Sequence, residues 1–410
     1  MSHRTAAREA TIDRTATAIG SRLHTETTGV LSEIGKLRIP ELVLFFGLIF
    51  EGSMFGLPLP FNQVVMLGII LLAITRRPQV ELGRLQMLVP LLVIGLFYIG
   101  MISMFADPSE FAFDWKRRLI RLALTAVLLM VLASGRIDFR SGLAGLGVGM
   151  LFNAFAFYSG FAPDYYGGYL SGFFEDKNVA GMAYAVFGVL MLAVVERRWM
   201  RVLLVLVIGV LVWETGSRTS IAALAAGVGW IVLAPKLAVL GRWLLGIAIV
   251  IGVAQVAEDY SQIGVFSDRE GSDLLRSRID AASEIKVHDA GFFGSGLGEA
   301  YVVFDDDPGK AWLFHNSYWT ALVEGGWPWL LVVLVVTVVF ALRPFTRELS
   351  RQEIVAQAAT VTTLICAWRL GEVLFTLQWA LVIAIALYTH ARARDRSMAG
   401  EPSADEVGAR

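Results

Sequence analysis

Residues 313–342 read LFHNSYWTALVEGGWPWLLVVLVVTVVFAL, and this stretch decides the class of fold. Its second half is almost entirely apolar, as expected of the ~20 residues that a helix needs to cross the hydrocarbon core of a bilayer. His315 and Asn316 stand where this run begins, and Glu324 lies within it. A buried polar group costs roughly 2–7 kcal/mol unless it is paired. The stretch therefore predicts a membrane helix whose polar groups have partners or a function.

The composition of the whole chain agrees with a membrane protein. Of its 410 residues 56% are hydrophobic and only 17% charged, against ~25% charged in soluble domains. The net charge of −1, with no basic domain, argues against nucleic-acid binding. The single cysteine, Cys366, excludes an intramolecular disulfide and a cysteine metal site. The five histidines lack zinc-site spacing, so we expect neither a metal nor another cofactor.

The hydropathy pattern predicts an all-α integral membrane protein with about twelve spans. Residues 1–39 read as a cytoplasmic tail, 40–390 as the membrane domain with a long, partly helical loop at about 258–315, and 391–410 as a disordered cytoplasmic tail. The expected spans lie near 41–56, 61–75, 85–105, 119–134, 139–160, 178–195, 200–214, 219–234, 243–257, 316–342, 354–370 and 373–390.

The distribution of positive charge predicts the orientation. Most of the 35 Lys and Arg residues fall in the two tails and in the loops on the same side as the tails. Because such loops stay in the cytoplasm, both termini are expected inside, and the long loop outside. Some cations remain on the outer side, and they either pair with neighbouring carboxylates or form a site for phosphate or pyrophosphate. They include Lys116, Arg117, Arg118, Arg121, Lys177, Arg218, Arg276, Arg278 and Lys286.

Individual motifs on the outer side leave alternatives open. ETGSRTSIAAL at 214–224 predicts a helix whose N-terminus and Arg218 could hold an oxyanion, or an arginine paired with Glu214. GSGLG at 294–298 lacks the context of a nucleotide-binding turn, and the aspartates at 305–307 favour a solvated loop. Asn316 suits a helix cap or a sugar hydroxyl. Glu324 is expected to pair with another helix or to order a kink at the glycines that follow it.

Four stretches occur in an order that resembles the O-antigen ligase and polysaccharide polymerase superfamily of bacterial inner membranes. They are GFFEDKNVAG at 172–181, TGSRTS at 215–220, Arg278 followed by GSGLG at 294–298, and HNSYWTALVEGG at 315–326. Each is weak alone, and the ordered set is more specific. The resemblance covers about residues 40–390 and leaves out both tails.

The resemblance implies a fold grouped with the lipid-carrier (GT-C type) glycosyltransferases and a metal-independent, inverting glycan transfer. The donor would be a glycan on undecaprenyl pyrophosphate, and the acceptor a sugar hydroxyl at the periplasmic face. Arg218 and Arg278 would grip the pyrophosphate, and His315 would activate or position the acceptor. Lys177, Asn178 and Asn316 lie in the matching stretches and are further substrate-binding candidates. Arg117, Arg118 and Arg121 are candidates only because they are expected outside.

Two glycosyltransferase functions and one transport function compete. The sequence FFEDKNVAG favours a polymerase of exopolysaccharide or O-antigen repeat units over a ligase that joins finished polymer to lipid A–core. A chain-length regulator is a possible partner of a polymerase. A flippase would also suit twelve spans, but the chain has no convincing half-to-half repeat, and its polar residues gather on one face of the membrane.

Overall fold

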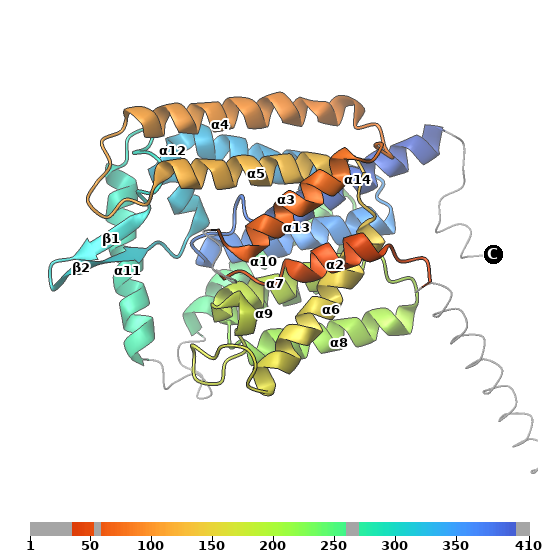
Figure 1. Ribbon diagram of the computed structural model, residues 1–410, viewed down its shortest axis with the longest axis horizontal. Coiled ribbons are helices and arrows are strands. Elements are labelled where there is room, and N and C mark those ends of the chain that lie inside the picture. Colours follow the sequence, from red (N-terminus) through yellow and green to blue (C-terminus); the bar gives the residue numbers. More distant parts are fainter. Residues whose placement is uncertain (1–34, 53–58, 260–269, 399–410) are drawn as a thin grey trace, which may run out of the picture.

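The computed structural model describes residues 35–52, 59–259 and 270–398, which form a mostly helical bundle (Figure 1). In this part of the chain, four helical stretches are long and apolar enough to cross a membrane: Gly83–Phe105, Phe139–Tyr158, Arg218–Lys236 and Ser317–Leu342. Shorter apolar helices cover Phe61–Ile74, Lys177–Met191 and Val239–Gln255. The chain is thus a helical membrane protein. The tail prediction for residues 1–39 falls almost wholly outside the described residues.

A helix lies in each range where a span is expected, and the crossing of the membrane by all twelve stays a prediction. The shortest, α2, has 9 residues and a length of ~14 Å, less than half of a bilayer core. The membrane-domain helices are α2 Ile39–Gly47, α3 Phe61–Ile74, α4 Leu88–Phe105, α5 Trp115–Ala133, α6 Phe139–Tyr158, α7 Lys177–Met191, α8 Arg198–Glu214, α9 Arg218–Leu233, α10 Val239–Asp259, α12 Ser317–Leu334, α13 Arg351–Arg369 and α14 Leu377–Met398. A π-helix, η6 Val335–Leu342, continues α12.

Polar residues before the helices fix where several of them begin. The carboxylate of Asp114 accepts hydrogen bonds from backbone N–H groups of the first turn of α5, and Asp176 does the same for α7. Asn316 caps α12, and Ser350 forms a capping box with Glu353 at the start of α13. Each cap satisfies backbone donors that would otherwise have no partner at a helix end.

Helices α7, α13 and α14 form the centre of the bundle. Every residue from Ala180 to Met191 of α7 is buried, as expected of a helix that is apolar all round. Helix α13 also buries threonines, whose hydroxyls donate to backbone carbonyls one turn earlier, as from Thr360 to Ala356 at 2.8 Å. The peripheral α4 instead exposes apolar side chains such as Phe97 and Phe105, which suits contact with lipid. The inner helices therefore supply the rigid frame of the site.

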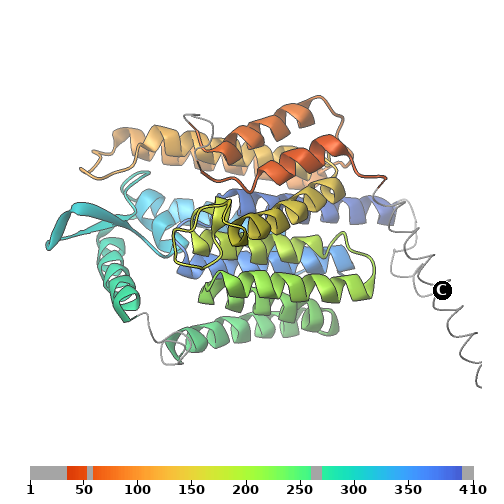
Figure 2. The ribbon, with the colours of Figure 1, turned by 60° about the horizontal axis from the view of Figure 1, so that its bottom comes forward.

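Helix α11 (Glu270–Asp289) and a β-hairpin lie together at one end of the bundle, here called the hairpin end, where α11 runs across the bundle axis (Figure 2). Strands β1 (Tyr301–Phe304) and β2 (Asp307–Leu313) pair antiparallel, with Val302 opposite Trp312. The mostly helical structure agrees with the expected all-α membrane fold, and the hairpin is a short departure from it inside the expected long loop. The β-branched and aromatic residues YVVF, followed by the turn-forming residues DDDPG, were the signals of a hairpin. Between α11, the hairpin and α12 lies a small core of Ile279, Ala300, Val302, Phe304, Phe314 and Val323.

The C-terminal boundary differs from the expectation. Helix α14 runs on to Met398, so residues 391–398 are helical and not a disordered tail. Arg394 ties this extension to the bundle by donating to the backbone carbonyls of Glu81 and Leu82. The rest of the predicted tail, residues 399–410, lies outside the described residues.

Candidate functional site at the hairpin end

Helix α12 is interrupted at Gly326, and the GSGLG segment docks on the break. Gly326 has φ 63° and ψ −164°, a conformation that is essentially restricted to glycine. The backbone N–H of Ser295 donates to the carbonyl of Val323 at 2.7 Å, and that of Gly296 to the carbonyl of Glu324 at 2.9 Å. These two N–H groups are used by α12, so they cannot cradle a phosphate.

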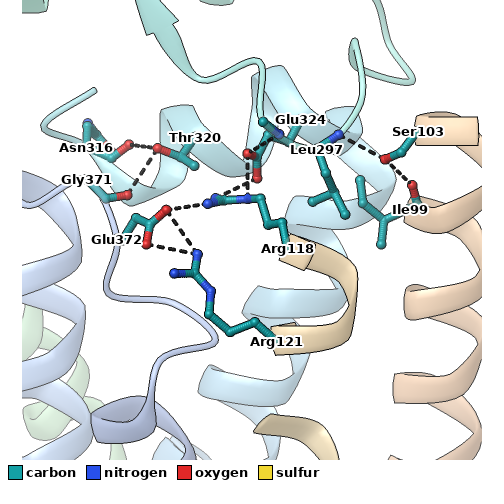
Figure 3. A network of polar contacts seen from close by, with 11 residues as sticks. Ile99, Ser103, Arg118, Arg121, Leu297, Asn316, Thr320, Glu324, Gly371 and Glu372 are labelled. Carbon is teal, nitrogen blue, oxygen red and sulfur yellow. Dashed lines mark hydrogen bonds and ion pairs between the residues drawn. The ribbon is translucent and has the colours of Figure 1, made fainter. Parts of the chain in front are cut away.

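Glu324 is buried and pairs with another helix, as the sequence suggested. Its carboxylate lies 2.8 Å from Nε of Arg118 on α5 and accepts a hydrogen bond from the backbone N–H of Gly298 at 2.9 Å. Arg118 also pairs with Glu372, and Arg121 donates to the same carboxylate at 3.0 Å (Figure 3). Two guanidinium groups and two carboxylates thus form one network, the arginine–glutamate quartet.

The connection between α13 and α14 places Glu372 in this quartet. The hydroxyl of Ser317 donates to the carbonyl of Leu370 at 2.6 Å, and the N–H of Val373 donates to that hydroxyl at 2.9 Å. Thr320 adds a hydrogen bond to the carbonyl of Gly371 at 3.1 Å. Desolvation would raise the pKa of Glu372, but the guanidinium groups of Arg118 and Arg121 outweigh it and hold this pKa at about 2.

A cavity of about 240 Å³ adjoins the quartet. It lies between α3, α5, α7, α12 and the start of α14, and all four members of the quartet line it. Amide, hydroxyl and aromatic side chains also line it. This space, here called the interior cavity, therefore offers charged, neutral polar and apolar surfaces together.

Glu51 also lines the interior cavity, from the connection between α2 and α3. Its carboxylate accepts a hydrogen bond from the side-chain amide of Gln378 at 3.2 Å. Desolvation raises the pKa of Glu51 to about 7. The hydrogen bond from Gln378 opposes this shift, and the nearby carboxylate of Asp176 adds to it. Glu51 is thus a carboxyl group that can gain or lose a proton near neutral pH.

Asn153 on α6 holds the GFFEDKNVAG stretch in place. Its amide oxygen accepts a hydrogen bond from the N–H of Phe173 at 2.7 Å, and its amide nitrogen donates to the carbonyl of Ser171 at 3.2 Å. Glu175 adopts φ 61°, unusual for a residue with a side chain. Its carboxylate lies against Gly52, where a Cβ atom would come within 2.0 Å of Oε1. The stretch therefore forms a constrained turn that presents Asp176.

Lys177 and Asn178 follow as the first residues of α7. The ammonium group of Lys177 lies 4.4 Å from the ring centre of Tyr169 and 5.5 Å from that of Tyr166. The backbone N–H of Asn178 donates to the cap Asp176 at 2.7 Å. Neither side chain lines the interior cavity.

The TGSRTS stretch packs directly against the GFFEDKNVAG stretch. A Cβ atom at Gly181 would lie 2.7 Å from the hydroxyl of Ser220 and 2.8 Å from that of Thr215, so only glycine permits this approach. Arg218 is the first residue of α9, directly after the N-cap Ser217, and its side chain is half-buried. The structure thus brings residues 172–181 and 215–220 into contact. It likewise brings GSGLG into contact with the Glu324–Gly326 segment.

His315 lies just before α12 and faces α11. Its Nδ1 is 3.9 Å from the carboxylate of Asp280. Desolvation and the charge of Arg276 lower the pKa of His315, while the carboxylates of Asp280 and Asp176 act in the opposite direction. Burial thus favours the neutral imidazole, the form that can accept a proton. The side-chain oxygen of Asn316 caps α12 and accepts hydrogen bonds of 3.0 and 3.3 Å from the backbone N–H groups of Tyr318 and Trp319.

Arg278, the residue matched by the resemblance, lies on a different face of α11 from the one directed at His315. Its guanidinium donates to Asp306 in the hairpin turn at 2.8 Å and stacks 4.0 Å from the centre of the Phe304 ring. Half of its side-chain surface is exposed. Arg276 and Asp280 are four residues apart and share the face of α11 that is directed at His315. Arg278 is two positions from each of them and therefore points elsewhere. Arg276 is therefore the arginine beside His315.

The cationic stretch at the start of α5 divides into two parts. Arg118 and Arg121 point into the interior cavity. Arg117 keeps 85% of its side-chain surface exposed, and its nearest carboxylate is that of Asp114 at 3.6 Å. Lys116 lies over the ring of Trp115. Because a helix turns by about 100° per residue, alternate members of the stretch necessarily point in different directions.

Among the described residues, no group of three or more His, Cys, Asp or Glu side chains is placed to hold a metal ion. The carboxylates of Glu324 and Glu372 are held by arginines, and that of Glu324 also by a backbone N–H group.

The fold and the site define a mostly helical membrane protein with a polar cavity and a neighbouring histidine at one end of its bundle. A comparison with models of known protein families finds no match to the chain, and a comparison with curated protein sequences finds none either.

Several residues of this site were not predicted from the sequence: Glu51, Asp280, Glu372 and Gln378. Glu372 and Gln378 occur in RLGEVLFTLQW, where two polar groups interrupt an apolar stretch, and this was the signal that could have drawn attention to them. Asp280 follows Arg276 by one helical turn, a spacing that places both on one face. Glu51 has no such signal, because its partner Gln378 is far away in the sequence.

Proposed function

We propose that this protein transfers a glycan from undecaprenyl pyrophosphate to the hydroxyl of an acceptor sugar, and that it polymerises lipid-linked repeat units. The observation that carries the proposal is the convergence of the matching stretches. Residues 172–181 contact 215–220 through Gly181, and residues 294–298 dock on 323–326. The stretches thus form two neighbouring pairs in space. The pairs meet at the interior cavity, which Val179 of the first pair lines together with Ser317 and Glu324 of the second. The hairpin end would face the periplasm.

The transfer is an inverting displacement at the anomeric carbon. The acceptor oxygen forms a bond to this carbon while the bond to the pyrophosphate oxygen breaks and leaves its electron pair on the pyrophosphate. The acceptor proton passes to the neutral imidazole of His315, whose proximity to Asp280 stabilises the imidazolium that results. Asp280 is a positioning residue in this scheme.

The leaving pyrophosphate gains negative charge in the transition state, so cations must lie near it. Arg218 and Arg278 are the arginines that the resemblance assigns to this role, and we add Arg276 because it lies beside His315. Loss of one preorganised contact to a developing anion typically reduces the rate by ~10²–10³. Arg278 would have to exchange Asp306 for the substrate. Arg276, whose guanidinium donates to the carbonyl of Arg369, lies on the face of α11 that His315 occupies.

The experiment that tests the proposal uses purified protein in nanodiscs with an undecaprenyl-pyrophosphate oligosaccharide built from the source organism's own repeat unit. A ladder of longer glycans from donor alone establishes a polymerase, whereas product only after addition of lipid A–core establishes a ligase. His315→Ala should abolish either product, and Arg276→Ala should reduce its rate of formation by ~10²–10³. Transfer at the wild-type rate in both variants, or no transfer by the wild type with an authenticated donor, would refute the proposal.

A further inference from the structure

We propose that the interior cavity is a binding subsite for one neutral sugar ring, and that within the proposed glycan transfer it holds the acceptor sugar. The binding of a saccharide follows from the cavity itself, while the role as acceptor site rests on the proposed function.

The charge balance of the cavity disfavours an anionic ligand. The positive charges of Arg118 and Arg121 are matched by the carboxylates of Glu324 and Glu372, which they contact directly. Glu51 adds a fifth ionisable group and no positive charge. A pyrophosphate would have to separate these pairs and leave buried carboxylates without partners, which costs several kcal/mol each. A neutral ligand leaves the quartet intact.

The neutral polar groups of the wall suit sugar hydroxyls. Amide side chains come from Asn62, Gln63 and Gln378, and hydroxyls from Thr125 and Thr376. Amides both donate and accept hydrogen bonds, as hydroxyl groups do, so the two are complementary in any orientation. These groups come from helices α3, α5 and α14 and from the segment before α14.

Asn62 carries an unsatisfied acceptor in this wall. Its side-chain oxygen is buried and has no hydrogen-bond partner within the part of the chain that the structure describes. An unpaired buried polar atom costs ~1–3 kcal/mol. A ligand hydroxyl that donates to this oxygen would remove the cost, so the cavity favours a ligand that carries a hydrogen-bond donor.

An aromatic wall completes the complement to a sugar ring. Trp329 and Phe375 both line the cavity, and their ring centres are 5.0 Å apart. Phe375 stacks in turn on the buried Trp379 at 4.4 Å, which fixes its orientation. A pyranose has one face of C–H groups that packs on such apolar surface, while its hydroxyls point outward to polar groups. The cavity offers both surfaces.

The size of the cavity limits the ligand. Its volume of about 240 Å³ lies below the ~300–1,000 Å³ of sites for drug-sized molecules. It suits a single sugar ring and is too small for a lipid-linked repeat unit. Gly371 lines the cavity and lies against the backbone of Phe314 and His315, and Ser317, two residues after His315, lines it too, so the cavity and the histidine are neighbours. A sugar in the cavity would therefore lie near the group proposed to take its proton.

Saccharide binding can be measured without any donor. The full chain, in lipid nanodiscs free of sugar detergents, is exposed to methyl glycosides of glucose, galactose, mannose, rhamnose and N-acetylglucosamine, and binding is read from saturation-transfer NMR. We expect at least one glycoside to bind. Asn62→Ala and Gln378→Ala should each weaken it roughly fivefold to tenfold through loss of a hydrogen bond. Gln86→Ala, an exposed amide outside the cavity, is the matched control and should leave binding unchanged.

A volume change supplies the second test. Ala321 lines the cavity, and Ala321→Leu would fill part of it while leaving every polar group in place. This variant should lose glycoside binding. The absence of binding to any glycoside, or equal binding by wild type, Asn62→Ala and Ala321→Leu, would overturn the inference. Glycoside binding by a protein that transfers no glycan would instead refute the proposed function and leave the subsite standing.

Discussion

At the scale of single residues, the hairpin end is organised by paired charges. Arg118 keeps only 13% of its side-chain surface exposed and contacts two carboxylates, of which Glu324 is 4% exposed. Arg121 is 38% exposed and contacts Glu372, which is equally exposed. A buried charge without its partner is far more costly than a partly exposed one. The two arginines, one helical turn apart, therefore have different energetic roles.

Arg118→Ala should destabilise the protein much more than Arg121→Ala. The first change leaves the buried Glu324 without its guanidinium, which typically costs ~3–5 kcal/mol. The second removes a partly exposed pair worth ~1 kcal/mol or less. Thermal unfolding in one detergent, followed by the fluorescence of the tryptophans, compares the two variants. Equal decreases in Tm would contradict the difference in burial that the structure assigns to them.

The protonation of His315 predicts a pH effect. Arg276 lowers the pKa of His315, so Arg276→Gln should raise it. If the neutral imidazole accepts the proton, activity is present above this pKa and lost as the pH falls through it. The acidic limb of the kcat/KM profile should therefore move to higher pH in Arg276→Gln. Asp280→Asn should move it to lower pH, because Asp280 favours the charged imidazole. Coincident limbs in all three proteins would argue against His315 as the base.

At the scale of elements, the break in α12 joins the hairpin-end segment to the bundle. Gly326 allows the carbonyls of Val323 and Glu324 to accept hydrogen bonds from GSGLG instead of continuing a regular helix. The same break directs Glu324 at both Arg118 and the N–H of Gly298. One helix interruption thus positions the loop and the quartet together.

Gly326→Ala should detach the GSGLG segment from α12. A Cβ atom there would lie 2.0 Å from the carbonyl oxygen of Phe292, in a backbone conformation that costs other residues ~1–3 kcal/mol even without the clash. Limited proteolysis should show cleavage near residues 290–300 in this variant and not in the wild type. Gly209→Ala, in α8 with nothing within 4 Å of the added Cβ, is the control and should be neutral or mildly stabilising.

At the scale of the whole molecule, the bundle has a hairpin end with the cavity and His315, and an opposite end with other arginine contacts. At the opposite end, Arg343 pairs with the buried Glu353, and Arg136 donates to the carbonyls of Ala73 and Arg76. The positive-charge distribution predicts that this opposite end faces the cytoplasm. The proposed chemistry requires the same orientation, because the acceptor is reached from the periplasm.

Cysteine labelling can test this orientation. Cys366 is buried, so a new cysteine provides the reactive thiol of interest. Lys310→Cys in the hairpin should react with a membrane-impermeant maleimide in intact spheroplasts. Glu348→Cys, exposed in the connection before α13, should react only after the membrane is opened. The reverse pattern would place the hairpin end in the cytoplasm and exclude periplasmic transfer.

Local patterns explain which features could be predicted without coordinates. Helix positions follow from apolar runs of sufficient length, and helix starts from caps such as Asp114 and Asn316, because both depend on residues close in the sequence. The pairing of Glu324 with another helix was predictable because a lone carboxylate in an apolar run requires a partner. The hairpin carried a local signal too, and was missed because a run of four strand-forming residues is easily taken for part of a loop.

The sequence by itself determined that this chain is a helical membrane protein whose polar residues are concentrated in a few stretches. Only the tertiary structure decided which polar residues meet. It paired Arg118 with Glu324 and Glu372, joined Glu51 to Gln378, and put Arg276 instead of Arg278 beside His315. The physical reason is that a charge within a helical bundle finds its partner across helices. That partner is set by the rotation and packing of each helix, which no local pattern encodes.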